Sequence, residues 1–371
     1  MASVEGRLTR RNGRETKVYD VRFRDPDGRQ RKKTFGKKGD ADRFAATVEA
    51  DKLRGQYVDH SDRTTVAEYA RAWASNRPHR QSTARRVSSL IETHIAGTKL
   101  GGRRVSAVRP SEVQAWASDR AQVLAPSTLR NLVSLLRSIY ASAVLDRLAA
   151  SSPVVRVALP RHERARVVPL TVEQVQALSD AMPERNRAMV LTQAGLGLRI
   201  GELLALRVED VDFLRRTARV EWQIAPGAKT RSEPKTPRSR RTVPLPQVVA
   251  DALAAHVAAL PPAEDGTIFT TRTGTPYRHD YYGSIIFAAA VKKAKLPAGT
   301  TSHDLRHHYA SVLLAAGESV IAVAERLGHE NATLVLSTYG HLMPDSEDRT
   351  RRAIDEAWCA ITAPSDQSAT R

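Results

Sequence analysis

The chain has 371 residues, of which 58 are Lys or Arg and 40 are Asp or Glu, so its formal net charge is +18. Hydrophobic residues make up 41% and charged residues 26%, an ordinary globular composition that excludes a disordered basic tail protein. The charge excess favours a polyanionic partner. Because one hydrophobic core rarely serves a chain of this length, we expect several domains.

Cysteine usage and the absence of long apolar runs predict the compartment. Cys359 is the one cysteine, which excludes an internal disulfide framework and a zinc ribbon and fits a reducing compartment such as the cytosol. The chain starts with an arginine-rich segment, and no run of 18 apolar residues occurs anywhere. We therefore expect neither secretion nor membrane spanning.

The N-terminal residues predict a small basic module of strands and one helix. Residues 17–35 alternate apolar and polar around the turn sequence Asp25-Pro-Asp-Gly28, which predicts a β-hairpin, and 41–57 predicts a helix. The alternation places several basic residues on one face of the sheet, where they either contact DNA or form a solvated surface. The DNA-contact candidates are Arg22, Arg24, Arg31, Lys32 and Lys33.

A helical region follows over residues 65–148. Thr64 or Thr65 is expected to cap a helix that runs through Trp73, and a second helix is expected over 85–95. Ser111 is the expected cap of a helix over 112–120, and Ser127 of one over 128–148, whose apolar stripe predicts core packing. Basic residues suited to tracking phosphates are Arg77, Arg80, Arg85, Arg86, Arg103 and Arg104.

A Pro- and Arg-containing stretch without periodicity, 151–166, predicts a linker and a domain boundary. Beyond it, Thr171 opens a helix with a capping box. Strands are expected at 218–224 and 241–245, on either side of a hairpin loop over 226–240. Further helices, expected at 248–260, 281–293, 303–316 and 321–327, make this a mostly α domain.

Arg199 and Glu202 are three residues apart in the segment 195–207, which places them on neighbouring positions of an apolar helix. A buried arginine needs an anionic partner. Glu202 satisfies that need by itself, or an incoming phosphate shares it. Glycines 195, 197 and 201 have the wrong spacing for a dinucleotide-binding loop.

His303 and Arg306 show the same spacing, so an imidazole and a guanidinium lie together on one helical turn. Thr301 or Ser302 is the expected cap, and the helix N-terminus adds partial positive charge where an anion docks. A satisfied histidine with an ordinary surface arginine is the alternative. Zinc binding by His303 and His307 is disfavoured, because no cysteine or carboxylate follows at suitable offsets.

His329 and Tyr339 complete an ordered set in the same domain. A tyrosine hydroxyl is a nucleophile toward phosphorus, although a lone tyrosine is more often a core aromatic with a hydrogen-bonded hydroxyl. The order favours the nucleophile: arginine, lysine on a hairpin, His-x-x-Arg, Gly-His and then tyrosine, in one basic protein.

This set resembles the tyrosine recombinases, the lambda-type phage integrases in particular. The resemblance lies in GLRIGELLAL (197–206), PKTPRSRRTVPL (234–245), HDLRHHYAS (303–311) and LGHENATLVLSTYGH (327–341). It implies a multidomain, mainly α fold with small β elements. The implied parts are an arm-type DNA-binding module of a three-stranded sheet plus helix (1–62), a helical core-site DNA-binding domain (63–150), the linker (151–166), a mixed α+β catalytic domain (167–360) and a flexible tail (361–371).

The resemblance also implies roles for the site residues. Tyr339 corresponds to the nucleophile and Glu202 to a supporting acidic position. The activating residues implied are Arg199, Lys235, His303, Arg306 and His329. Lys235 would protonate the departing 5′ oxygen, with Lys229 as a rival, and neither metal nor cofactor is required.

The implied activity is integration or excision of a phage or other mobile element through a 3′-phosphotyrosyl intermediate and a Holliday junction. Partners implied are double-stranded DNA attachment sites, three further copies of the chain, a directionality factor and a host DNA-bending protein, in a prokaryotic cytoplasm. A stripe of Ile354, Trp358 and Ile361 on the last helix would dock on a neighbouring protomer or on its own core.

Three other functions stay open at this point. A type IB-like DNA topoisomerase shares the catalytic set, but the separate basic N-terminal modules argue against it. A non-catalytic site-specific DNA-binding protein is disfavoured by the complete set of site residues. A metal-dependent nuclease built on His303 and His307 would be inhibited by a chelator, whereas the favoured chemistry runs in EDTA.

Overall fold

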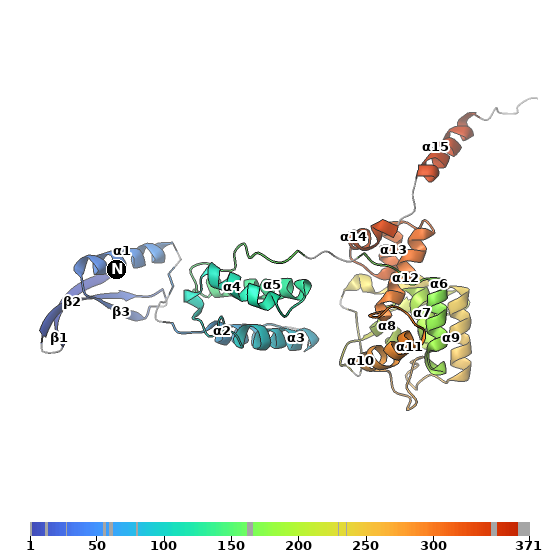
Figure 1. The fold of residues 1–371 in the computed structure, drawn as a ribbon, viewed down its shortest axis with the longest axis horizontal. Coiled ribbons are helices and arrows are strands. Elements are labelled where there is room, and N and C mark those ends of the chain that lie inside the picture. Colours follow the sequence, from blue (N-terminus) through green and yellow to red (C-terminus); the bar gives the residue numbers. More distant parts are fainter. Residues whose placement is uncertain are drawn as a thin grey trace, which may run out of the picture. The chain divides into compact units, whose positions relative to one another are not determined.

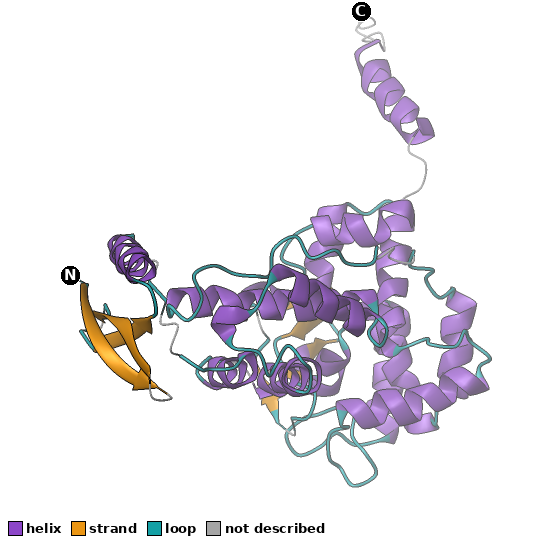
Figure 2. Ribbon diagram, turned by 60° about the vertical axis from the view of Figure 1, so that its left-hand side comes forward, coloured by secondary structure: helices purple, strands orange, loops and turns teal. Residues whose placement is uncertain are grey.

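The computed structural model describes residues 2–11, 14–26, 28–54, 57–58, 62–78, 81–161, 166–228, 230–234, 236–342 and 347–362. It is mainly helical, with a three-stranded sheet at the N-terminal end and short strands in the C-terminal half (Figures 1 and 2). This confirms the predicted fold class. The chain divides into two compact units, residues 1–164 and 165–371. None of the helices described combines the length and apolar character needed to cross a bilayer.

The N-terminal unit begins with an antiparallel sheet that packs on one helix. Its elements are β1 (Ser3–Arg11), β2 (Arg14–Arg24), β3 (Gln30–Phe35) and α1 (Lys38–Leu53), with strand order β1-β2-β3. The predicted hairpin is therefore β2–β3, and Gly28 takes the positive φ of 83° that its turn requires. Val21 and Phe23 on β2 pack against Ala45 and Val48 of α1, so this sheet and helix share a small core of their own.

The helical region has a second, separate core. Its elements are α2 (Val66–Ser75), α3 (Gln81–Ile91), the π-helical η1 (Glu92–Ala96), the 3-10 turn η2 (Val105–Ala107), α4 (Pro110–Ala121) and α5 (Pro126–Leu145). Thr65 is the cap of α2, and its hydroxyl accepts a hydrogen bond from the Glu68 amide. The predicted apolar stripe of α5 is buried, with Leu132 and Leu136 at its centre.

The caps predicted for α4 and α5 are wrong. Each helix begins one residue before the predicted serine, at Pro110 and Pro126. Proline at the first helical position costs no hydrogen bond, because that N–H has no partner within a helix, and its fixed φ suits the first turn. Ser111 and Ser127 therefore lie inside the helices. α5 also ends at Leu145, before Arg147 takes a φ of 58°.

The first half of the 151–166 stretch packs on the helical region instead of extending freely. Val154 lies in the second core, and the Ala158 backbone exchanges two hydrogen bonds with the Gln114 side chain, at 2.8 and 3.1 Å. No helix or strand forms in its described residues.

The C-terminal unit is a helical domain with two small antiparallel sheets. Its first half contains α6 (Val172–Ala181), α7 (Glu184–Leu196), α8 (Ile200–Ala205), η3 (Val208–Asp210), β4 (Val211–Asp212), β5 (Thr217–Val220), β6 (Gln223–Ile224), β7 (Arg231–Ser232), η4 (Pro237–Ser239) and β8 (Arg241–Pro244). Its second half contains α9 (Gln247–Ala259), α10 (His279–Tyr281), the π-helical η5 (Tyr282–Phe287), α11 (Ala288–Lys293), α12 (Ser302–Ala315), α13 (Val320–Leu327), α14 (Thr333–Tyr339), η6 (Gly340–Leu342) and α15 (Glu347–Thr362).

Two predicted elements of this unit are divided in the structure. The strand expected over 218–224 is two strands, because β5 pairs with β4 and β8 whereas β6 pairs with β7. The helix expected over 281–293 is interrupted by the π-helical η5. The Thr171 capping box is confirmed, since its hydroxyl accepts from the Gln174 amide.

Two glycines on either side of Arg199 allow close packing, of the end of α7 against α12 and of α8 against β6. Gly197 ends α7 with a φ of 62°, and a Cβ on it would lie 2.4 Å from the Tyr309 ring. A Cβ on Gly201 would lie 2.6 Å from the Ile224 carbonyl oxygen. Close packing thus explains these glycines, and it fixes the backbone of Arg199 between the two helices.

Candidate active site

Arg199 stands immediately before α8 and pairs with Glu202 on the first turn of that helix. Its backbone N–H donates to Glu202 Oε2 at 2.9 Å and its Nη1 donates to Oε1 at 2.8 Å. Nη2 also donates to the Gly328 carbonyl at 3.2 Å. The Arg199 side chain is 38% exposed and that of Glu202 only 2%, so the predicted ion pair forms and leaves the guanidinium facing solvent.

Arg306 lies in the interior of α12 and is 2% exposed. Its Nη1 donates to the Gly197 carbonyl at 2.6 Å and its Nη2 to the Leu327 carbonyl, at the ends of α7 and α13. Burial and the neighbouring Arg199 lower the pKa of Arg306 to about 9, which leaves the guanidinium charged at neutral pH. The ordinary surface arginine considered from the sequence is thus excluded.

The sequence analysis missed a third arginine, Arg241 at the start of β8. Its Nη2 and Nη1 donate to the two carboxylate oxygens of Glu202 at 2.8 and 3.2 Å, and its Nε donates to the Arg326 carbonyl at 2.6 Å. No spacing rule marks Arg241, because it is one of three arginines within 238–241 and its carboxylate partner is 39 residues away.

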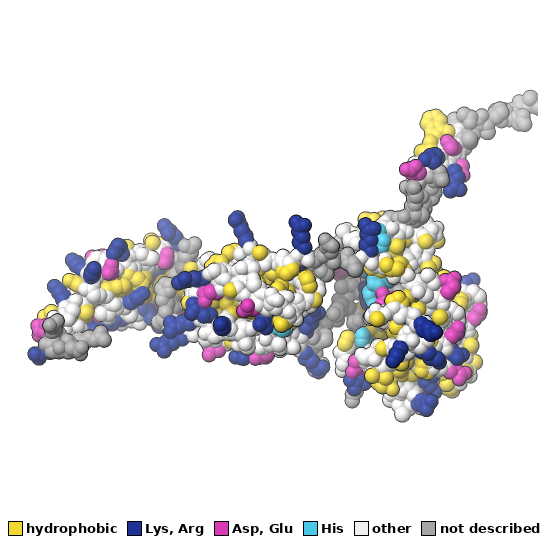
Figure 3. All heavy atoms as spheres, viewed as in Figure 1, with side chains coloured by type: hydrophobic (Ala, Val, Ile, Leu, Met, Phe, Trp, Pro, Cys, Tyr) yellow, Lys and Arg dark blue, Asp and Glu magenta, His cyan; other side chains and the backbone are white. Residues whose placement is uncertain are grey.

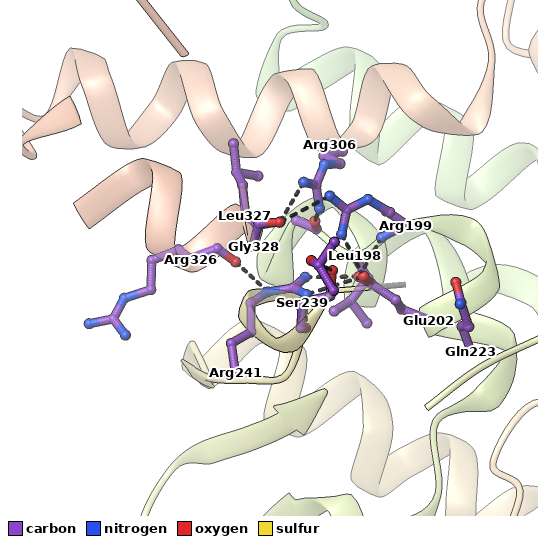
Figure 4. Close-up of polar contacts among 12 residues, drawn as sticks. Leu198, Arg199, Glu202, Gln223, Ser239, Arg241, Arg306, Arg326, Leu327 and Gly328 are labelled. Atoms are coloured by element: carbon purple, nitrogen blue, oxygen red, sulfur yellow. Dashed lines mark hydrogen bonds and ion pairs between the residues drawn. The ribbon is translucent and has the colours of Figure 1, made fainter. Parts of the chain in front are cut away.

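These residues form an arginine cluster of Arg199, Arg241 and Arg306 around one carboxylate (Figure 4). Burial raises the pKa of Glu202, but attraction by Arg241, Arg199 and Arg306 outweighs it and lowers the pKa to about 2. Three guanidiniums and one carboxylate leave an excess of two positive charges. Since Arg199 is the exposed member, the cluster is suited to binding an anion beside it.

Two histidines border the cluster. His303 opens α12, where the Thr301 hydroxyl accepts from its backbone N–H at 3.3 Å and caps the helix. His329 follows Gly328, the left-handed residue that ends α13. Partial desolvation of the ring, helped by His307 and Arg306, lowers the pKa of His303 to about 4, although the residue as a whole is exposed. Burial, helped by Arg306 and Arg199, does the same for His329. Both imidazoles are therefore neutral hydrogen-bonding groups at neutral pH.

The lowered pKa values of these two histidines predict that the protein loses stability in acid. Since their folded pKa of about 4 lies below the unfolded value of about 6.5, the unfolded chain binds more protons between these values, and stability falls as pH falls through this window. His303 is exposed and His329 half-buried, so with solvent screening we expect a loss of about 1–3 kcal/mol. Urea unfolding at pH 7 and at pH 4 measures it. A double variant, His303→Asn with His329→Asn, should lose less, and an equal loss would contradict this origin.

Tyr339 ends α14 and is 3% exposed. Its hydroxyl oxygen lies 2.6 Å from Nδ1 of His307, one helical turn beyond His303. Burial raises the pKa of the phenol, and Arg306 acts in the opposite direction. The hydroxyl is thus protonated at neutral pH, and the positive charge of Arg306 favours its ionised form. The sequence analysis named Tyr339 but missed its contact with His307, since 32 residues separate the two.

Lys235 and its rival Lys229 lie outside the described residues. The elements on either side of Lys235 are β7 and η4, and β8 follows with Arg241. Arg238, on η4, donates to the Glu330 carbonyl next to His329. The described residues that follow Lys235 in the chain therefore lead to Arg241 and the arginine cluster.

Within the residues described, no three His, Cys, Asp or Glu side chains gather as a metal-binding group. The rings of His303 and His307 meet edge to face with centroids 4.7 Å apart. The Nδ1 atom of His307 is hydrogen-bonded to the Tyr339 hydroxyl.

Residues 169–345, which contain the whole cluster and Tyr339, match the family described as "Phage integrase family". A tyrosine recombinase of Thermosipho africanus is 30% identical to this chain over 220 residues, which cover 58% of this chain and 72% of that one. The chain belongs to this family of tyrosine recombinases. It is therefore a tyrosine-type site-specific recombinase that acts on DNA.

Relatives match this recombinase along most of its length. It is 28% identical over 332 residues to a prophage phiRv2 integrase of Mycobacterium tuberculosis, covering 86% of this chain and 87% of that one. The Tn1549 transposon integrase in complex with a circular intermediate DNA is similar in fold, with a TM-score of 0.68, 24% identity and coverage of 79% of this chain and 99% of that one. A lambda integrase tetramer bound to a Holliday junction is also similar in fold, with a TM-score of 0.62 and 17% identity, covering 92% of this chain and 95% of that one.

The basic residues of the recombinase's N-terminal sheet divide between its two faces. Arg22, Arg24 and Lys32 share the face opposite α1, where Arg22 pairs in register with Lys32. Buried Asp20 lies at the centre of this face, 2.7 Å from Lys32 and from Arg7. In contrast, Arg31 and Lys33 lie on the α1 face. The predicted placement of several basic residues on one face is therefore met by Arg22, Arg24 and Lys32, and not by all five candidates.

On α1's side of the sheet, the two remaining candidates have internal partners. Lys33 lies over the Phe44 ring, with Nζ 4.3 Å from its centroid, and Arg31 pairs with Asp25 at 3.0 Å. Arg22 also contacts Glu5 at 3.4 Å, but across an exposed surface. Arg22, Arg24 and Lys32 are all exposed on the sheet face that α1 leaves uncovered, although Lys32 also pairs with Asp20.

The basic residues of the helical region are mostly solvent-facing. Arg85 and Arg86 are exposed on α3, Arg104 is exposed before η2, and Arg77 stacks on the Trp73 ring at 4.4 Å. Arg103 pairs with Glu112 at 2.8 Å, and Arg80 lies outside the described residues. Figure 3 shows Lys and Arg side chains spread over this unit and projecting from it.

Proposed function

We propose that this recombinase cleaves and rejoins DNA attachment sites through a covalent 3′-phosphotyrosyl intermediate formed by Tyr339. The observation that carries the proposal is the position of Tyr339, buried in the same unit as the arginine cluster, with its hydroxyl hydrogen-bonded to His307, the residue that follows Arg306 on α12. Attack on a phosphodiester concentrates negative charge on its non-bridging oxygens. Arg199 and Arg306, held by fixed carbonyls and by Glu202, stabilise that charge without reorganising.

The remaining site residues complete the reaction. His303 and His329, as neutral imidazoles, donate hydrogen bonds to the phosphate oxygens. The Tyr339 oxygen forms a bond to phosphorus, the bond from phosphorus to the 5′ oxygen breaks, and Lys235 gives that oxygen a proton. Because the phosphotyrosyl bond retains the energy of the broken bond, a 5′ hydroxyl of another strand reverses the step without ATP.

The assembly we propose is a tetramer of this chain on two duplexes, which exchanges strands through a Holliday junction. The lambda integrase neighbour was solved as such a tetramer on a junction, and it supports this proposal at the level of fold. The helix α15 is the element we propose for contact between protomers, since Ile354 and Trp358 are 55% and 66% exposed. The third residue of that stripe, Ile361, has no described side chain.

The DNA-binding parts follow the separate cores of the N-terminal unit. We propose that residues 1–62 bind arm-type DNA with the sheet face that carries Arg22, Arg24 and Lys32, and that residues 63–150 bind core-type sites. Residues 151–166 then link these parts to the catalytic domain at 167–360. Residues 361–371 form a tail. Residues 363–371 lie outside the described part. Proteins that supply directionality or bend the DNA remain proposed partners of the arm complex.

Covalent adduct formation without metal tests the proposed chemistry. Purified protein in EDTA is mixed with nicked suicide duplexes made from DNA flanking its gene, and adducts resistant to SDS are separated on a gel, with a gel shift as binding control. We expect an adduct at one position in each site. Firm binding without an adduct would reject the proposed chemistry in favour of a DNA-binding protein, and cleavage only with metal would favour a nuclease.

Removal of residues 1–60 tests the arm module. Because this module has its own core, the helical core remains intact, and cleavage of core-type sites should continue at the full-length rate. Integration into long arm-bearing substrates should fall about 10²-fold, since one of two linked DNA contacts is lost. Equal integration by the truncated and full-length proteins would reject the arm assignment.

A further inference from the structure

His307 forms a hydrogen bond with the Tyr339 hydroxyl, and none of the roles assigned above uses it. Its Nδ1 lies 2.6 Å from the Tyr339 oxygen, and the two rings meet at 62° with centroids 5.5 Å apart. His307 follows Arg306 on α12, so the residue that binds the phosphate and the residue that touches the nucleophile are neighbours in the chain.

The surroundings of His307 keep it able to accept a proton. Burial lowers the pKa of the imidazole, Arg306 lowers it further, and Asp304 raises it. The ring is thus neutral at neutral pH. Burial also keeps the phenol protonated. In the tautomer that carries its proton on Nε2, Nδ1 has a free lone pair and accepts the hydrogen bond from the Tyr339 O–H.

His303 helps to fix the orientation of this pair. Its ring meets that of His307 edge to face, at 86° and 4.7 Å, and this contact restricts rotation of the His307 side chain. The groups that face His307 are therefore His303, Asp304 and Arg306 on α12 and Tyr339 on α14. Of these four residues, only Tyr339 has a hydroxyl that is hydrogen-bonded to Nδ1 of His307, and that hydroxyl oxygen is the proposed nucleophile.

We propose that His307 is the general base that accepts the phenolic proton of Tyr339 as the hydroxyl attacks the phosphodiester. This inference rests on the proposed function. The oxygen–phosphorus bond forms as the O–H bond breaks, the proton moves to Nδ1, and the departing 5′ oxygen takes its own proton from Lys235. In the rejoining step a 5′ hydroxyl attacks phosphorus and gives its proton to Lys235, while the bond from phosphorus to the Tyr339 oxygen breaks and the imidazolium returns its proton to that oxygen. His307 and Lys235 both end in their starting states.

Substitutions that keep the hydrogen bond but remove the base separate these two roles. In His307→Asn, the side-chain oxygen takes the place of Nδ1 and accepts the Tyr339 hydrogen bond, but it does not take up a proton. We expect single-turnover cleavage of suicide duplexes to slow about 10²-fold, with unchanged gel-shift affinity. His307→Ala should be slowed at least as much, and added imidazole should restore part of its rate. His341→Asn, an exposed histidine two residues beyond Tyr339, is the matched control and should cleave normally.

Making the nucleophile more acidic provides a readout that a structural role would not change. With difluorotyrosine incorporated at position 339, the phenol loses its proton more readily, so the rate difference between His307 and His307→Asn should shrink. A His307→Asn protein that cleaves at the wild-type rate overturns the inference. A defect that difluorotyrosine and imidazole both leave unchanged also overturns it and marks His307 as a positioning residue. A wild-type protein that forms no adduct at all rejects the proposed function itself.

Discussion

Replacing Tyr339 by Phe is expected to remove the covalent adduct completely while leaving DNA affinity unchanged. The ring is buried and packs in the same core in both proteins, so only the hydroxyl is lost. The described contact of that hydroxyl is the hydrogen bond to His307, so the free energy of unfolding should fall by only about 1 kcal/mol. SDS gels of suicide-substrate reactions, gel shifts and thermal unfolding measure the three quantities.

Tyr282→Phe is the matched control for this experiment. Tyr282 is fully buried in the same unit, and its hydroxyl has no hydrogen-bond partner among the described residues. Its removal should leave both cleavage and stability intact. Loss of DNA binding in Tyr339→Phe, or an adduct that persists, would identify Tyr339 as a structural residue and place the nucleophile elsewhere.

Arg306→Lys is expected to have the second-largest effect, because it damages the reaction and the fold together. A lysine ammonium is a single point charge, whereas the guanidinium reaches the Gly197 and Leu327 carbonyls through two different nitrogens. We expect cleavage to slow about 10²–10³-fold as a donor to the reacting phosphate is lost. Leaving buried carbonyls without donors should lower the free energy of unfolding by about 2–4 kcal/mol.

Arg199→Lys separates the two effects. The Arg199 side chain is 38% exposed and its Glu202 partner keeps Arg241, so this variant should slow cleavage comparably with little loss of stability. Single-turnover cleavage and urea unfolding of both variants give the comparison. If Arg306→Lys cleaved at the wild-type rate, Arg306 would be a structural residue alone.

Local rules explain the parts of the structure that the sequence predicted well. The helix cap expected at Thr64 or Thr65, the capping box at Thr171 and the three-residue spacing of Arg199 and Glu202 depend on atoms within one helical turn, so the local sequence is sufficient to predict them. The caps at Ser111 and Ser127 failed because a proline one residue earlier fits the first helical turn better.

Contacts between distant segments could not be predicted from spacing. Arg241 reaches Glu202 across 39 residues, and His307 reaches Tyr339 across 32. Neither the packing of β8 beside α8 nor that of α14 on α12 has a local signal. In the N-terminal sheet the alternation by itself places Lys32 and Lys33 on opposite faces, but which of these faces α1 covers depends on tertiary packing.

The carbonyls that hold Arg306 also have a consequence for how this protein can change over evolutionary time. They lie where α7 and α13 end, and carbonyls at helix ends have no partner within their own helix. Arg306 thus caps the C-terminal ends of α7 and α13, and it also carries a positive charge that acts in the reaction. Its loss is penalised even in a lineage that no longer recombines DNA, whereas loss of the Tyr339 hydroxyl costs the fold little. Descendants that have become simple DNA-binding proteins should therefore keep the arginine and lack the tyrosine.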